Sequence, residues 1–107
     1  MNLEILLSAR AEQDITLQYR WYLDHADEAV AEHYLRCVHA TFESISAKPD
    51  LGRRRRFAAQ ELAHIRSLQV QKPFDRHLIF YQAAAALLIE RVLHGSRDLP
   101  RLFLNEP

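Results

Sequence analysis

The chain has 107 residues, enough for one domain with one hydrophobic core. Hydrophobic residues make up 49% and charged residues 26%, which excludes a disordered chain, and the 14 basic and 14 acidic residues cancel, which disfavours a generic nucleic-acid-binding protein. The only cysteine, Cys37, can form no intrachain disulfide, and no apolar segment has the length of a membrane span. We therefore expect a single cytoplasmic domain over residues 1–107 that does not contact a membrane.

A short apolar run from Asn2 to Leu7 predicts a first strand, and Ser8 after it suits the N-cap of a helix. In this helix apolar and aromatic residues recur at steps of three and four and so share one face: Ala11, Ile15, Tyr19, Tyr22 and Ala26. A break near 24–27, with Asp27 as the next cap, predicts a second helix. Its stripe is Ala31, Tyr34, Leu35, Val38, Phe42 and Ile45. So short a link predicts an antiparallel helical hairpin.

Pro49 and Gly52 end the second helix, and the hydrophobic period then changes. We expect three strands, over 65–70, 76–82 and 87–93. In the middle strand the predicted faces are Leu78, Phe80 and Gln82 against His77, Ile79 and Tyr81; in the last they are Ile89 and Leu93 against Glu90 and Val92. The predicted fold is α+β: an N-terminal strand and a two-helix antiparallel hairpin packed on an antiparallel sheet with a C-terminal three-stranded meander.

The segment 87–99, LLIERVLHGSRDL, resembles the closing strand of the ParE/RelE toxin superfamily. The resemblance extends back through HLIFY at 77–81, the break at Pro49 and Gly52, and the opening residues Ser8, Ala11, Asp14, Ile15 and Tyr19. It implies the toxin of a type II toxin–antitoxin system, held in a hetero-oligomer by a cognate, ParD-like antitoxin. The ending HGSRD at 94–98 looks more like the ParE branch than the RelE branch.

The resemblance leaves two targets open, because one fold can serve several functions. ParE-like members are associated with poisoning DNA gyrase, whereas RelE-like members cut messenger RNA on the ribosome. Such cleavage needs a base, a cation and an acid, which RelE-like enzymes draw from basic residues on the sheet and a tyrosine near the C-terminus. The tail after Arg97 has no tyrosine, histidine or lysine. The substitutes are His64, Arg66, Tyr81 and Arg97.

We therefore expect gyrase inhibition by binding, without catalysis and without a cofactor. An mRNA endonuclease on the ribosome is the alternative, and a degenerate binding module that has lost toxicity is a third possibility. The helical spacing of His33 and Cys37 supplies only two ligands, so we expect no metal site and a Cys37 that packs beside the core.

Charge is unevenly distributed along the chain. Residues 1–47 carry a net charge of −5 and residues 48–77 a net charge of +5. The run Arg53, Arg54, Arg55 and Arg56 is either a patch for phosphate or for an acidic protein surface, or a solvated loop. His94, Arg97 and Asp98 form a second candidate target contact, for which the alternative is a histidine that holds the turn and an ordinary ion pair.

Leu17 and Trp21 fall about 200° and 240° around the first helix from Ile15, opposite its apolar stripe. An exposed apolar pair one helical turn apart suggests a docking surface for the antitoxin or for a second copy. The alternative is a cover formed by the C-terminal Leu102 and Phe103. On the sheet, Arg66 and Tyr81 are further candidate antitoxin contacts, and the antitoxin is expected to add a helix or a strand to the toxin.

Overall fold

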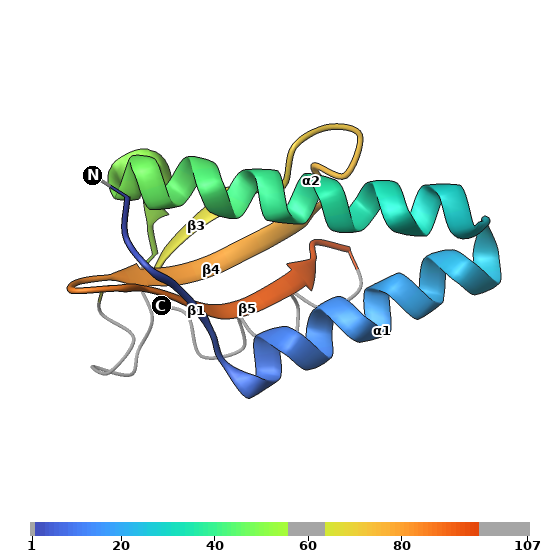
Figure 1. Ribbon diagram of the computed structural model, residues 1–107, viewed down its shortest axis with the longest axis horizontal. Coiled ribbons are helices and arrows are strands. Elements are labelled where there is room, and N and C mark those ends of the chain that lie inside the picture. Colours follow the sequence, from blue (N-terminus) through green and yellow to red (C-terminus); the bar gives the residue numbers. More distant parts are fainter. Residues whose placement is uncertain (1, 56–63, 97–107) are drawn as a thin grey trace.

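The structure is a computed structural model that describes residues 2–55 and 64–96 (Figure 1). Its elements in chain order are β1 (Ile5–Leu7), α1 (Ala9–His25), α2 (Glu28–Ala47), the 3-10 turn η1 (Pro49–Leu51), β2 (Arg53–Arg54), β3 (Arg66–Gln69), β4 (His77–Ala83) and β5 (Leu87–His94). The strands form one sheet in the order β1-β5-β4-β3-β2, and the helices form a hairpin with α1 next to β5 (Figure 1). The predicted α+β fold is confirmed.

The predicted caps position both helices. The Ser8 hydroxyl accepts the N–H of Ala11 at 3.0 Å, and the Asp27 carboxylate accepts the N–H of Val30 at 2.9 Å. These bonds satisfy amides that the first turn of a helix leaves without partners. Neither helix is long and apolar enough to cross a membrane, as far as the described residues go.

The buried face of α1 matches the predicted stripe in part, because Ala11 is buried and Ile15 and Tyr22 pack against the core. Its buried residues are Ala11, Asp14 and Gln18, while Ala26 is exposed and Tyr19 donates its hydroxyl to Glu32 on α2 at 2.9 Å. Polar side chains face the protein here because α1 lies along β5 at the side of the sheet, where backbone groups need partners. The stripe of α2 is confirmed, apart from Leu35, which is half-buried.

The sheet is mixed rather than wholly antiparallel. β1 pairs with β5 in parallel, with Ile5 opposite Leu87 and Leu7 opposite Ile89, while β2 to β5 form an antiparallel meander. The hydrophobic pattern of a three-residue strand does not encode the direction in which it pairs. The predicted antiparallel sheet is therefore corrected at this edge.

A β-bulge changes the predicted faces of β5. Tyr81 pairs with Ile89 but Phe80 pairs with Arg91, so Glu90 is an extra residue in β5. As a result Ile89 and Val92 both belong to the hydrophobic core. The prediction that these two lie on opposite faces was wrong, because the bulge adds one residue to the two-residue repeat. In β4, His77, Ile79 and Tyr81 share one face, as predicted, and the structure shows that this face is turned toward the helices.

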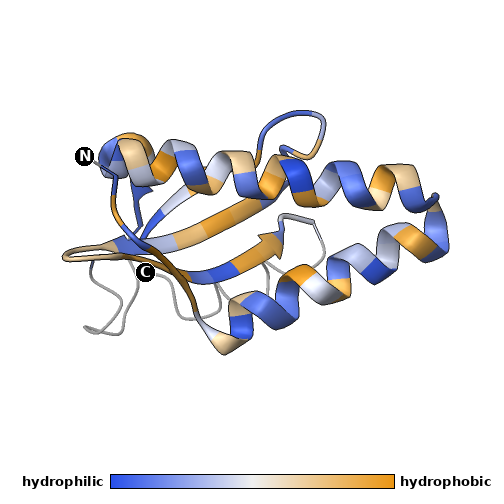
Figure 2. Ribbon diagram, viewed as in Figure 1, coloured by the Kyte–Doolittle hydropathy of each residue, from blue (hydrophilic) through white to orange (hydrophobic). Residues whose placement is uncertain are grey.

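The core lies between the hairpin and the sheet. Figure 2 shows hydrophobic residues in stripes along both helices and along β4 and β5. The largest fully buried side chains include Tyr34 and Phe42 from α2 and Ile79 and Tyr81 from β4. Cys37 is buried among them, which confirms its predicted packing role.

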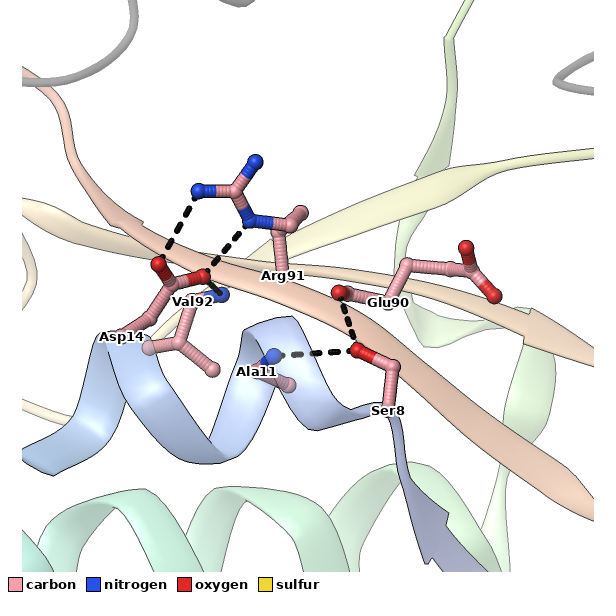
Figure 3. A network of polar contacts seen from close by, with 6 residues as sticks. All are labelled: Ser8, Ala11, Asp14, Glu90, Arg91 and Val92. Atoms are coloured by element: carbon pink, nitrogen blue, oxygen red, sulfur yellow. Dashed lines mark hydrogen bonds and ion pairs between the residues drawn. The ribbon is translucent and has the colours of Figure 1, made fainter.

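Polar side chains of α1 close the edge of β5 where β1 ends (Figure 3). The Ser8 hydroxyl donates to the carbonyl of Glu90 at 2.7 Å. The Asp14 carboxylate accepts the N–H of Val92 at 3.0 Å and two bonds from the Arg91 guanidinium, at 2.8 and 3.0 Å. A strand edge with unpaired backbone groups invites unwanted strand addition. These contacts instead tie the helical hairpin to the sheet.

Candidate functional site

Arginines occupy the β2 edge of the sheet. Arg53 and Arg54 are exposed, and in the register Arg53 is opposite Ser67 while Arg54 is opposite Arg66. Because side chains alternate along a strand, Arg54 and Arg66 share one face and Arg53 lies on the other. Within 2–55 and 64–96 the side chains of Arg53 and Arg54 have no hydrogen bond or ion pair.

The remainder of the predicted arginine run differs in setting. Arg55 is half-buried, with its guanidinium carbon 5.6 Å from the centre of the Phe80 ring, a cation–π contact on the face of the sheet away from the helices. Arg56 lies outside the described residues. Among the described residues of the run, Arg53 and Arg54 are the exposed ones.

A buried tyrosine fixes the turn that leads into β2. The Tyr81 hydroxyl donates to the carbonyl of Pro49 at 2.6 Å and accepts the N–H of Gly52 at 2.8 Å. A Cβ on residue 52 would lie 2.6 Å from this hydroxyl and 2.8 Å from the Ser67 carbonyl, so only glycine fits. Arg66 completes the arrangement by donating to the Gly52 carbonyl at 2.8 Å. We call these contacts the Tyr81 lock.

The Tyr81 lock makes Tyr81 a poor candidate within the predicted catalytic set of His64, Arg66, Tyr81 and Arg97. Tyr81 is 0% exposed, and burial raises the pKa of its hydroxyl, outweighing the Gly52 hydrogen bond and the Arg66 charge, which lower it. A hydroxyl that already donates and accepts, and that resists ionisation, is poorly suited to move a proton. His64 is exposed at the surface, and Arg97 lies outside the described residues.

The same burial corrects one predicted antitoxin contact. Tyr81 presents no surface to a partner protein, because its ring lies in the core and its hydroxyl is held by backbone groups. Arg66 is different, since 29% of its side chain is exposed and its Nη2 lies 3.5 Å from the carboxylate of Asp50. The structure gives Tyr81 a structural role and leaves Arg66 accessible.

His94 holds the turn after β5. Its Nδ1 accepts the N–H of Ser96 at 3.2 Å and lies 3.0 Å from the hydroxyl of that residue, and the ring is buried. This is the turn-holding role that the sequence offered as the alternative to target contact. The other members of the predicted cluster, Arg97 and Asp98, lie outside the described residues.

The predicted exposure of the apolar pair on α1 is confirmed. Leu17 and Trp21 are 54% and 38% exposed, and Trp21 stacks on His25 with ring centres 4.2 Å apart. Leu102 and Phe103, the internal cover suggested by the sequence, lie outside the described residues. In the described part of the chain, no group of three His, Cys, Asp or Glu residues could hold a metal ion.

Sequence reasoning missed Asp14 and Arg91 as the residues that join α1 to β5. Their bond is an ion pair of 2.8 Å between elements far apart in the chain. In the sequence, Asp14 stands out only as part of a resembled motif. The available signal was its position three residues after the buried Ala11, which places it on the same face of α1.

Known proteins share both the sequence pattern and this fold. A family model described as the ParE toxin of the type II toxin–antitoxin system parDE matches residues 5–99. A solved structure described as a chromosomal ParDE TA system from P. aeruginosa has a TM-score of 0.69 and 12% identity, covering 86% of this chain and 95% of that chain. No curated protein matches the sequence. With a family match over most of its length and the same fold, the chain belongs to the ParE toxin family of type II toxin–antitoxin systems.

Proposed function

We propose that this toxin inhibits DNA gyrase by binding it in the cytoplasm, without chemistry of its own, and that a cognate ParD-like antitoxin neutralises it. Family membership supports the toxin role. The observation that carries the choice of binding over cleavage is the Tyr81 lock, which commits the sheet tyrosine to two backbone hydrogen bonds.

Cleavage of messenger RNA needs a group to remove the proton of the 2′-hydroxyl and another to protonate the leaving oxygen. Of the four predicted substitutes, Tyr81 is buried with a raised pKa and Arg66 is hydrogen-bonded to the Gly52 carbonyl. His64 then remains as the one described member of that set whose side chain can act as an acid or a base. A single such group supports cleavage less well than the exposed surfaces support binding.

We assign the target contact to the β2 edge. Arg53 and Arg54 project from an outer strand of the sheet, and Arg66 lies beside them on β3. Planar guanidinium groups match carboxylates and phosphates with paired hydrogen bonds. Both kinds of anion are available on a topoisomerase that holds DNA.

We assign the antitoxin contact to the outer face of α1. Leu17 and Trp21 lie one helical turn apart and together expose apolar surface of the kind that anchors an amphipathic helix. Tryptophan is enriched among the residues that carry most of the binding energy at interfaces. The target and antitoxin contacts are thus on different elements, β2 and α1.

The experiment is expression of the chain without its partner, with plasmid supercoiling and mRNA 5′ ends measured in the same culture. We expect loss of supercoiling while messages stay intact. Messages cut at codon positions, with normal supercoiling, would support the ribosome-dependent alternative. Normal growth with folded protein present would support the degenerate binding module.

A pair of double variants tests the target surface in that culture. Arg53→Gln with Arg54→Gln should restore supercoiling. Arg20→Gln with Arg36→Gln makes the same change in charge at exposed positions on α1 and α2 and should stay toxic. Equal rescue by both would contradict the assignment to β2.

A further inference from the structure

Two arginines face each other across the outermost strand pair of the sheet. Arg54 and Arg66 are directly opposite in the antiparallel register of β2 and β3. Directly opposite residues have Cβ atoms about 5 Å apart, and like charges in such a pair destabilise a sheet. The one carboxylate that pairs with either of them in the described residues is Asp50, 3.5 Å from Arg66 and 93% exposed, so solvent weakens its effect.

The pair sits on a rigid support. Arg66 is held by its bond to the Gly52 carbonyl, and Gly52 is held in turn by the Tyr81 hydroxyl. This bond holds the Arg66 guanidinium at the sheet edge through Nη1, and 29% of the side chain stays exposed. Arg54 across the strand is exposed and adds a second cation on the same face.

We propose that Arg54 and Arg66 form an anion subsite that binds a backbone phosphate of duplex DNA. A phosphate between the two guanidinium groups would replace their repulsion with two charge-assisted contacts. The inference rests on the proposed function only in identifying this duplex with the DNA that gyrase holds.

Arg53 favours DNA over a protein carboxylate as the source of the anion. It lies on the opposite face of the same edge strand, next in sequence to Arg54. One carboxylate would serve one face, whereas a DNA backbone that runs along the edge presents phosphates at regular spacing to both. The net charge of +5 over residues 48–77 acts in the same direction, although the neutral whole chain limits the affinity.

The test is fluorescence anisotropy of a labelled duplex oligonucleotide titrated with the purified full-length chain, without gyrase, at several salt concentrations. We expect measurable binding at low salt. Arg54→Gln should weaken it several-fold and reduce the slope of log affinity against log salt by about 0.9, the loss of one phosphate contact. Arg36→Gln, the same change at an exposed position on α2, is the matched control and should leave the slope unchanged.

A second pair of variants asks for a gain of binding, which misfolding cannot produce. Asp50→Asn removes the carboxylate that competes for Arg66, and it should tighten DNA binding. Asp24→Asn removes the same charge from an exposed position near the end of α1 and should have a smaller effect. Equal gains would mean that net charge, rather than the Arg54–Arg66 pair, governs binding, and would overturn the proposal.

The proposal is also overturned if the chain does not bind the duplex, or if Arg54→Gln weakens binding to gyrase or antitoxin protein in the absence of DNA while DNA binding is unchanged. Its failure is separable from failure of the proposed function. If the chain inhibits gyrase but does not bind duplex DNA in the absence of gyrase, the DNA subsite is refuted and gyrase remains the target. If the chain binds DNA with the predicted variant effects but supercoiling stays intact, the DNA subsite is supported and gyrase is refuted as the target.

Discussion

Replacing Tyr81 with phenylalanine separates a structural tyrosine from a catalytic one. The change removes one hydroxyl that donates to the Pro49 carbonyl and accepts the buried N–H of Gly52. The carbonyl is on a half-buried residue and can recover a water, which costs about 1 kcal/mol, whereas the buried amide stays without a partner at about 1–3 kcal/mol. Tyr81→Phe should therefore destabilise the fold by about 2–4 kcal/mol.

Differential scanning calorimetry measures this directly. For a domain of this size, 2–4 kcal/mol corresponds to a decrease in Tm of about 10–20 °C. Tyr19→Phe is the control, because it removes a tyrosine hydroxyl whose partner, Glu32, lies on the surface between the helices, and it should change Tm little. An unchanged Tm for Tyr81→Phe together with lost toxicity would show that this hydroxyl acts in function rather than in holding the fold.

Three further perturbations have defined outcomes. Asp14→Ala leaves Arg91 and a buried amide of β5 without their carboxylate, and urea unfolding should show a loss of about 3 kcal/mol with an unchanged m-value. Leu17→Glu or Trp21→Ala should weaken antitoxin binding in calorimetric titrations by at least about tenfold with little change in Tm, and unaltered affinity would exclude that face of α1. Because burial raises the Tyr81 pKa above 10.0, the folded state holds this proton more tightly than the unfolded chain, so its contribution to stability is lost as pH rises beyond 10. The deficit of Tyr81→Phe in urea unfolding should accordingly be smaller at pH 11 than at pH 9, and an equal deficit would contradict the raised pKa.

Features of the fold that depend on neighbouring residues could be predicted from the sequence. Ser8 and Asp27 were identified as caps because a cap acts within its own turn, where side-chain chemistry decides the outcome. The alternation that places Ile79 and Tyr81 on the core face of β4 is equally local. The exposure of the apolar pair on α1 followed from helical geometry alone.

Features that depend on distant backbone atoms could not be predicted. The partners of the Tyr81 hydroxyl are backbone groups 29 and 32 residues away, and backbone groups give no signal in the sequence. From the sequence, Tyr81 therefore suggested a surface contact or a catalytic group. The bulge at Glu90 was missed for a related reason, because the run from Leu87 to Leu93 has no glycine to mark a break in the two-residue repeat.

Supercoiling of relaxed plasmid by purified gyrase and ATP, with no ribosome or other protein present, tests whether this toxin acts by binding through its arginine edge. Added wild-type chain should stop the reaction, and added antitoxin should restore it. The Arg53→Gln, Arg54→Gln double variant should inhibit only at much higher concentration, while remaining folded by circular dichroism. Full supercoiling in the presence of excess folded wild-type chain would contradict gyrase as the target.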